Sequence, residues 1–272
     1  MMPSSTSLSS MGQKKRVVKL GGRAQSAVEL PSLIAAAWHE TPGALCVVHG
    51  GGDEISALQR TLGGEPKFAG GRRVTTADDI AIIRMVLSGV VNKRLVGSFV
   101  AAGAPAVGIS GEDASLIAAQ PLGIAEFGYV GMPAAINAGV IQALWSAGYL
   151  PVISPLGANA ASGDGSALNV NGDDAAAAIA VALGADELLL IADVEGVLDD
   201  AKRVISQLPV DDARALITSG VAVGGMAAKL EAAHAALAGG VAKVRIADLA
   251  ALTDPRRGTT VTAAAVAGGV HA

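Results

Sequence analysis

Residues 16–22 read Arg-Val-Val-Lys-Leu-Gly-Gly, a short β-branched and apolar run that ends in paired glycines. Residues 47–53 follow the same order as Val-Val-His-Gly-Gly-Gly-Asp. Similar apolar runs alternate along the chain with alanine- and leucine-rich stretches of helical character. Strands that are apolar on both faces are typical of a parallel sheet covered by helices. We therefore predict an α/β protein, a three-layer αβα sandwich with a mainly parallel central sheet.

Hydrophobic periodicity and turn residues predict the other elements on either side of these two stretches. Thr76 or Thr75 is the expected N-cap of the longest helix, and Gly148 is expected to end another. Strands are predicted over residues 16–20, 45–48, 106–110, 152–154, 187–192 and 243–247. Helices are predicted over residues 26–40, 76–102, 133–147, 173–183, 211–219 and 225–238, with a short one after Asp53.

The composition excludes several classes of protein. A hydrophobic content of 51% with 16% charged residues rules out disorder for most of the 272 residues. The net charge of −4 and the scattered basic residues argue against a nucleic-acid partner. No apolar run reaches the roughly 18 residues of a membrane span, and the N-terminus lacks the apolar core of a signal peptide. We expect a cytoplasmic protein that does not bind membranes, and its single cysteine, Cys46, fits a reducing compartment.

The chain divides into three parts by composition and motif content. Residues 1–13 are polar and serine-rich, and we expect them to be disordered. A boundary near Ala185 separates an N-terminal lobe, 14–185, from a C-terminal lobe, 186–272. The four histidines have no metal-ligand spacing with each other or with Cys46, so no metal site is predicted.

The two glycine-rich strand ends indicate anion binding. Glycine lets backbone N–H groups approach an anion closely, and Lys19 places a cation beside them. An ordinary turn is the alternative at Gly21-Gly22. The His-Gly-Gly-Gly run at residues 49–52 also resembles the oxyanion loop of α/β-hydrolases, but the chain has no Gly-x-Ser-x-Gly elbow. It also has neither a P-loop nor a dinucleotide-binding glycine motif, so bound ATP would need another glycine scheme.

Three later segments carry further polar groups. Leu168-Asn-Val-Asn-Gly-Asp-Asp174 opens an alanine-rich helix and holds more acidic and amide groups than an N-cap needs. Gly224-Gly225 opens another helix, with Lys229 about one turn in, where a cation opposes the helix dipole unless an anion is bound. A solvated helix lysine is the alternative reading. Residues 191–198 end a strand in an acidic turn, which could equally be a surface loop.

Taken in order, these segments resemble the amino acid kinase family, and within it the members that act on N-acetyl-L-glutamate. The resemblance spans about residues 16–261. It includes Phe-Ala-Gly-Gly-Arg-Arg-Val-Thr at 68–75, Val-Asn-Lys-Arg-Leu at 91–95, Gly-Ile-Ser-Gly at 108–111 and Ala-Gly-Tyr-Leu-Pro-Val at 147–152. Each piece is weak alone, whereas their ordered combination is specific.

The resemblance implies a role for named residues. Lys19 and Lys229 match the two lysines that clamp the transferred phosphoryl group, and Asp173 matches the aspartate that holds both. Arg73 matches the arginine that grips the substrate α-carboxylate, and Asn169 an asparagine that contacts the substrate. Glycine N–H groups are expected to bind phosphate and substrate, from Gly21, Gly22, Gly50 and Gly51. The nucleotide segment matches Asp193, Val194, Glu195, Gly196, Val197, Leu198, Val221, Ala222 and Val223.

The resemblance further implies an ATP-dependent kinase that converts N-acetyl-L-glutamate to N-acetyl-L-glutamyl 5-phosphate, the second step of arginine biosynthesis. The lobe 14–185 would bind the amino-acid substrate and form a homodimer, and the lobe 186–272 would bind ATP. Mg²⁺ would be held mainly by the nucleotide phosphates. Because the accepting carboxylate is already ionised at neutral pH, no general base is needed. The short segment before Arg16 predicts no arginine feedback.

Two alternatives stay open at this stage. One methylene contributes only about 1–3 kcal/mol of discrimination, so an aminoadipate derivative or aspartate is a competing substrate. A non-catalytic amino-acid or nucleotide sensor on the same fold is the other alternative.

Overall fold

An eight-stranded sheet runs through the centre of the molecule, in the order β12-β14-β13-β11-β1-β2-β8-β5. The computed structural model describes residues 13–199 and 201–263, so residues 1–12 of the predicted disordered segment lie outside it. Every neighbouring pair of these strands is parallel except β13 and β14, which confirms the predicted mainly parallel sheet. The strands are β1 (Arg16–Leu20), β2 (Leu45–His49), β5 (Ala106–Ser110), β8 (Leu150–Ser154), β11 (Glu187–Ile191), β12 (Gln207–Pro209), β13 (Lys243–Ala247) and β14 (Thr259–Thr262).

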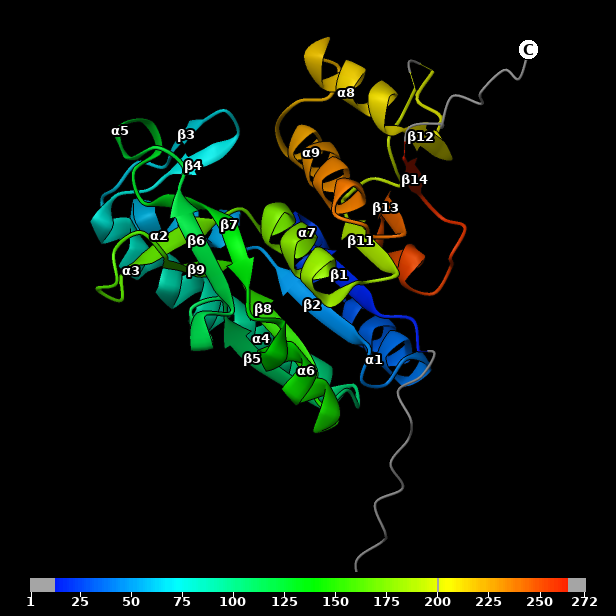
Figure 1. Cartoon of the computed structure of the whole chain (residues 1–272), viewed down its shortest axis with the longest axis horizontal. Coiled ribbons are helices and arrows are strands. Elements are labelled where there is room, and N and C mark those ends of the chain that lie inside the picture. The colour runs from blue at the N-terminus through cyan, green and yellow to red at the C-terminus, as the bar shows by residue number, and fades with distance from the viewer. Residues whose placement is uncertain (1–12, 200, 264–272) are drawn as a thin grey trace, which may run out of the picture.

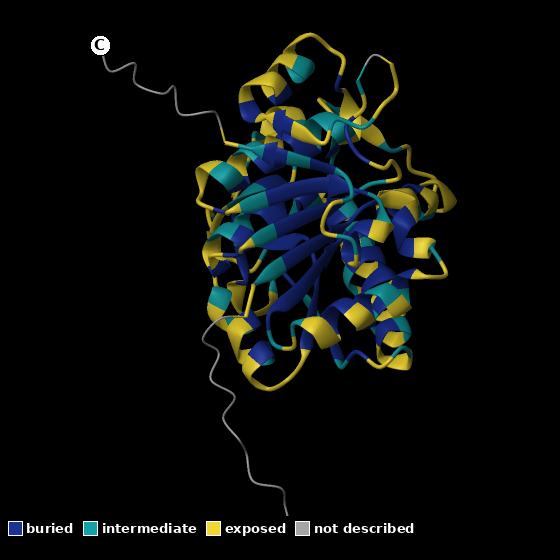
Figure 2. Cartoon of the chain, turned by 90° about the vertical axis from the view of Figure 1, so that its right-hand side faces the viewer, coloured by how far each residue is buried: buried dark blue, intermediate teal, exposed yellow. Residues whose placement is uncertain are grey.

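Helices cover the sheet on both sides, which gives the predicted three layers (Figure 1). On one side α7 (Gly172–Leu183) packs on β1, β2 and β11, with α9 (Gly224–Ala238) and α6 (Ala138–Ser146) beside it. On the other side α4 (Asn92–Ala101) packs on β5 and β8, and α1 (Leu30–Glu40) contacts α4 and the 3₁₀ turn η4 (Leu249–Leu252). The central strands are almost wholly buried, while the outer faces of the helices are exposed (Figure 2).

The remaining helices lie around this core. Their bounds are α2 (Gly52–Thr61), α3 (Ala77–Arg84), α5 (Ile124–Phe127) and α8 (Val210–Thr218), with 3₁₀ turns η1 (Gly22–Ser26) and η3 (Asp113–Ser115). A π-helical stretch, η2 (Met85–Val91), joins α3 to α4.

Two smaller sheets lie within residues 14–185. Strands β6 (Ile117–Pro121), β7 (Val130–Ile136), β9 (Leu156–Asn159) and β10 (Ala167–Val170) close into a four-stranded arrangement. A hairpin of β3 (Lys67–Ala69) and β4 (Arg72–Val74) turns at Gly70 and Gly71, which both have positive φ values of 52° and 75°. Glycine adopts this region without the steric cost that a Cβ would bring.

Two predicted helices differ from the structure. The helix over 26–40 begins only at Leu30, because Pro31 lacks an N–H and fits only the first turn of a helix. The helix over 133–147 is wrong in its first part: residues 133–136 belong to β7, and α6 begins at Ala138. Pairing of β7 with β6 and β10 overrides the helical preference of its alanines.

The predicted helix over 76–102 is continuous, but its middle turns are π-helical. Its N-cap is Thr76, whose hydroxyl accepts from the Asp79 N–H while the Asp79 side chain accepts from the Thr76 N–H. Within the described residues, no helix is both long enough and apolar enough to cross a membrane.

Candidate active site

Two lysines and one aspartate meet at the carboxyl edge of the central sheet. Lys19 Nζ lies 3.0 Å from Asp173 Oδ1, and Lys229 Nζ lies 3.2 Å from the same oxygen and 3.3 Å from Oδ2. All three side chains are at most 9% exposed. The structure therefore brings together the three residues predicted to be catalytic, which come from three separate elements, β1, α7 and α9.

Local structure places each of these groups. Lys19 is the penultimate residue of β1, paired in register with Val48 of β2 and Leu190 of β11. Asp173 stands in the first turn of α7, where the N-cap Asn171 accepts from its N–H at 2.8 Å. Lys229 lies in the second turn of α9, which begins at Gly224 with a φ of 55°.

Gly21 lies between the two ammonium groups. A Cβ built on it would lie 3.5 Å from Lys19 Nζ and 3.6 Å from Lys229 Nζ, and only 2.8 Å from the Ile191 carbonyl oxygen. Real Cβ atoms do not approach a backbone oxygen that closely, so a side chain here would force the strand ends apart. Because Gly21 has no side chain, the space next to both ammonium groups stays open.

Burial and charge act against each other at this centre. Burial, and after it the neighbouring Lys19, lower the pKa of Lys229 to about 8 against the opposing effect of Asp173. Burial alone would raise the pKa of Asp173, but the two lysines outweigh it and hold that pKa below its ordinary value. The centre at neutral pH is therefore one carboxylate between two ammonium groups, with a net positive charge suited to an anion.

A cavity of about 260 Å³ opens beside Lys229. Its walls include Gly21, Gly22, Asp193, Gly225 and Lys229. Gly22 has a φ of 36°, and a Cβ on it would lie 3.2 Å from the Asp193 carboxylate. Backbone N–H groups, a helix N-terminus and an ammonium group at one cavity are a suitable arrangement for phosphate.

A second cavity, of about 190 Å³, lies next to the first, and Met226 contributes to the walls of both. Its other walls are largely apolar, and they contain six of the residues predicted for nucleotide binding: Val194, Gly196, Val197, Leu198, Val221 and Ala222. Glu195 and Val223 line neither cavity; Glu195 pairs with Arg257 at 3.2 Å, and Val223 is the exposed N-cap residue of α9.

The predicted substrate residues belong to the loop after β2, to the β3–β4 hairpin and to β10. Gly50 and Gly51 follow β2, and the Gly50 N–H donates to the Leu20 carbonyl at 3.2 Å, which ties the two glycine loops together. Gly172 packs between Lys19 and the end of β2, because a Cβ on it would lie 3.2 Å from Lys19 Cε and 3.6 Å from the His49 carbonyl.

Arg73 is held by helix α2. Its Nη2 donates to the Gly52 carbonyl and the Ser56 hydroxyl, both at 2.8 Å, and its Nη1 donates to the Gln59 side chain. These bonds use three of the five N–H donors of a guanidinium group. Phe68 covers the guanidinium plane at 4.8 Å.

Asn169 donates from Nδ2 to the Thr75 hydroxyl at 3.0 Å, which joins β10 to the residue after β4. Sequence reasoning missed Gln59, Ser56 and Met226. Their roles depend on contacts between distant segments, and no local pattern marks them.

The His49 ring has both of its nitrogens in hydrogen bonds. It is fully buried, and burial lowers its pKa to about 4, so the ring is neutral. The Asn92 amide donates to Nε2 at 3.1 Å, which leaves the proton on Nδ1 to be donated to the Gly50 carbonyl at 2.9 Å. Among the described residues, no cluster of three or more His, Cys, Asp or Glu side chains could hold a metal ion.

Comparison with known proteins agrees with this geometry. The model of the amino acid kinase family matches residues 14–248. The acetylglutamate kinase of Paracoccus denitrificans is 46% identical over 202 residues, which are 74% of this chain and 66% of that protein. The acetylglutamate kinase of Geobacillus stearothermophilus is 38% identical over 86% of this chain and 89% of its own length. Among solved structures, smu.665 of Streptococcus mutans UA159 superposes with a TM-score of 0.82 at 32% identity, covering 91% of this chain and 98% of that one.

Proposed function

This chain belongs to the amino acid kinase family, and we propose on that premise that it phosphorylates the side-chain carboxylate of N-acetyl-L-glutamate with ATP. The products would be ADP and N-acetyl-L-glutamyl 5-phosphate, which makes this the second step of arginine biosynthesis. The observation that carries the proposal is the pair of lysines held by one aspartate beside a glycine-lined cavity. Relatives similar over most of this chain bear the name acetylglutamate kinase.

The chemistry follows from the charges at this centre. A substrate carboxylate oxygen attacks the γ-phosphorus, a new P–O bond forms, and the bond to the β,γ-bridging oxygen breaks and releases ADP. Negative charge spreads over the equatorial oxygens during transfer, and fixed cations stabilise that charge without moving. Lys19 and Lys229 supply the cations, and Asp173 keeps both in place. Because the attacking carboxylate is already ionised, the neutral His49 is not needed as a base.

The two cavities suit the two ends of a nucleotide. The cavity at Gly21, Gly22 and Lys229 would hold the phosphates, and the apolar cavity around Val197 and Ala222 would hold the base. Met226, in the walls of both, would lie along the ribose between them.

The acylated amino acid would be bound by the predicted substrate residues, among which Arg73 carries the positive charge. Arg73 keeps two N–H donors free of the bonds described above, enough for the α-carboxylate of the substrate. The Gly50 and Gly51 backbone and the Asn169 amide would complete this side.

Mg²⁺ fits the site as an ion carried in by the nucleotide. Asp193 is the acidic residue in the phosphate cavity wall, and it would be the protein ligand beside the phosphate oxygens. When bound, the ion neutralises phosphate charge. We further propose a cytoplasmic homodimer in which residues 14–185 bind the amino-acid substrate and residues 186–272 bind ATP.

The test is incubation with ATP, Mg²⁺ and a panel of acidic substrates, with hydroxylamine to trap any acyl phosphate. The panel contains N-acetyl-L-glutamate, N-acetyl-L-aminoadipate, N-acetyl-L-aspartate and L-aspartate. Hydroxamate formed at least tenfold faster from N-acetyl-L-glutamate than from the others supports the proposal. Faster product from another acid would reassign the substrate, and no product from any of them would point to a sensor.

A further inference from the structure

The β3–β4 hairpin carries two consecutive arginines that are fastened to different helices. Side chains of neighbouring strand residues point to opposite faces. Arg73 therefore reaches α2, while Arg72 reaches the first turn of α7. Nothing in the proposed reaction uses Arg72.

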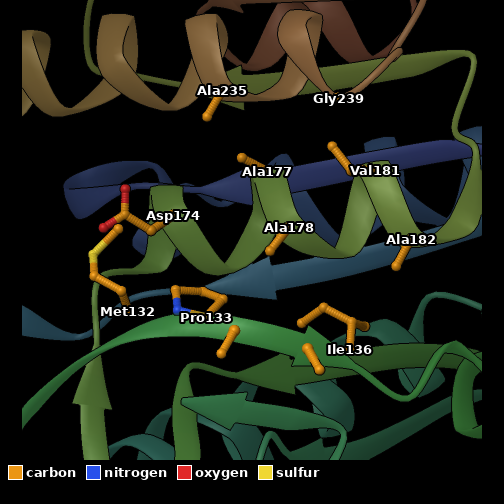
Figure 3. Close-up of a pocket in the computed structure, with 12 residues that line it drawn as sticks. Met132, Pro133, Ile136, Asp174, Ala177, Ala178, Val181, Ala182, Ala235 and Gly239 are labelled. Carbon is orange, nitrogen blue, oxygen red and sulfur yellow. The ribbon is translucent and has the colours of Figure 1, made fainter. Parts of the chain in front are cut away.

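Arg72 pairs with Asp174, the residue after the lysine-bridging Asp173. Arg72 Nη1 lies 2.5 Å from Asp174 Oδ2, and the two side chains are 18% and 9% exposed. Asp174 stands at one end of the groove between β7, α7 and α9, with its carboxylate beside Met132 (Figure 3). Burial raises the pKa of Asp174, and the paired Arg72 opposes that rise.

The tip of the same hairpin reaches the start of α9. A Cβ built on Gly71 would lie 3.9 Å from the Cα of Gly224, the first residue of that helix. The hairpin thus contacts α2 through Arg73, α7 through Arg72 and α9 through its tip. The hairpin therefore reaches from the predicted substrate residue Arg73 to the helix that carries Lys229.

We propose that Arg72 and Asp174 form a positioning pair that fixes the hairpin, and with it the Arg73 guanidinium, at a set distance from the phosphoryl-transfer centre. The pair ties the group that grips the substrate α-carboxylate to the helix turn that holds the two lysines through Asp173. This inference rests on the proposed function, because it assigns Arg73 to the amino-acid substrate.

A pair that only stabilised the fold would act differently in kinetics. Its loss would lower the fraction of folded enzyme, so the apparent kcat would fall and both KM values would stay the same. A positioning pair acts on one substrate only. Its loss would raise KM for the acylated amino acid and leave KM for ATP unchanged, since the nucleotide cavities do not include the hairpin.

The test compares Arg72→Ala, Asp174→Asn and the double variant with the wild-type enzyme, at saturating levels of the second substrate. We expect each single variant to raise KM for N-acetyl-L-glutamate about tenfold, which equals about 1.4 kcal/mol. The double variant should match the single ones, because residues that act as one unit are not additive. Arg72→Lys keeps the charge with a shorter reach, and we expect it to recover part of the effect.

Arg84→Ala is the matched control. It breaks another arginine–carboxylate pair of the same lobe, Arg84 with Glu112 at 2.6 Å, away from the hairpin. We expect wild-type KM values for both substrates in this variant. Equal rises in both KM values, a fall in kcat alone, or additive single effects would each overturn the inference. An inactive wild-type enzyme would instead refute the proposed function, so the two failures are distinguishable.

Discussion

Asp173→Asn should destabilise the protein by an amount that shrinks as pH rises. The change keeps the shape of the side chain and removes the charge between Lys19 and Lys229, each 3.0–3.3 Å away. Loss of one partner from a buried ion pair costs about 3–5 kcal/mol. Here the loss of stability has an upper limit, because a lysine that has lost its carboxylate partner can become neutral by releasing its proton. Relative to the unfolded chain, where the lysine pKa is 10.5, a neutral buried lysine costs about 4.8 kcal/mol at pH 7 and about 2 kcal/mol at pH 9. The wild-type protein already bears part of this cost, because the pKa of Lys229 is lowered to about 8.

The assay is urea unfolding of the variant and the wild-type protein at pH 7 and pH 9. Asp174→Asn is the control, because it lies one residue along the same helix turn but leaves an arginine, which keeps its charge at both pH values. We expect the free-energy loss of Asp173→Asn to be smaller at pH 9 than at pH 7 by about 1 kcal/mol or more, and that of the control to change little. An equal loss at both pH values for Asp173→Asn would refute the idea that this carboxylate balances two titratable ammonium groups.

Three further predictions concern activity. Lys229→Ala should lower kcat by a factor of about 10²–10³ with a smaller change in either KM, because one fixed cation is lost from the transition state. Steady-state kinetics measure this effect, and a wild-type kcat in the variant would show that Lys229 does not belong to the site. Because the pKa of Lys229 is lowered to about 8, its charge is lost as pH rises through 8. The value of kcat/KM for ATP should therefore fall above pH 8. The value of kcat should stay constant to a higher pH, because it is measured with anionic ATP bound. A constant kcat/KM up to pH 9.5 would contradict this. Ala222→Leu fills the apolar cavity. It should raise KM for ATP about tenfold or more without changing KM for the acylated amino acid. A titration with ADP as competitor should show the same loss of nucleotide affinity.

The layers and the parallel sheet could be predicted because each central strand is a local apolar run. Residues 16–20 and 243–247 are predicted with the bounds that the structure has. The strands β6, β7, β9 and β10 could not be predicted in this way. They are rich in alanine and are held by pairing between distant segments, as the pairing of Asn169 with Val130 and of Ala118 with Ala158 illustrates.

In the candidate site too, the residues in local patterns could be predicted and those held by contacts between separate segments could not. Lys19, Asp173 and Lys229 stand next to glycines or at helix starts, and such local patterns mark a residue for attention even where its partner is unknown. The hydrogen bonds of Arg73 to Gln59 and Ser56 are different, because they join a hairpin residue to helix residues that lie 14 and 17 positions earlier in the chain. Arg72 and Asp174 are separated by 102 positions, and only the folded chain brings them together.

The position of β1 has a consequence for synthesis of the protein on the ribosome. Its first neighbour, β2, is made soon after it, but its second neighbour begins at Glu187, which pairs with Arg16 across 171 positions of chain. Until that segment emerges, one side of β1 presents unpaired backbone N–H and C=O groups. A flat apolar strand with a free edge is a template for pairing with another nascent chain. The strand that carries Lys19 is thus also a place where the growing chain is open to pairing with another chain.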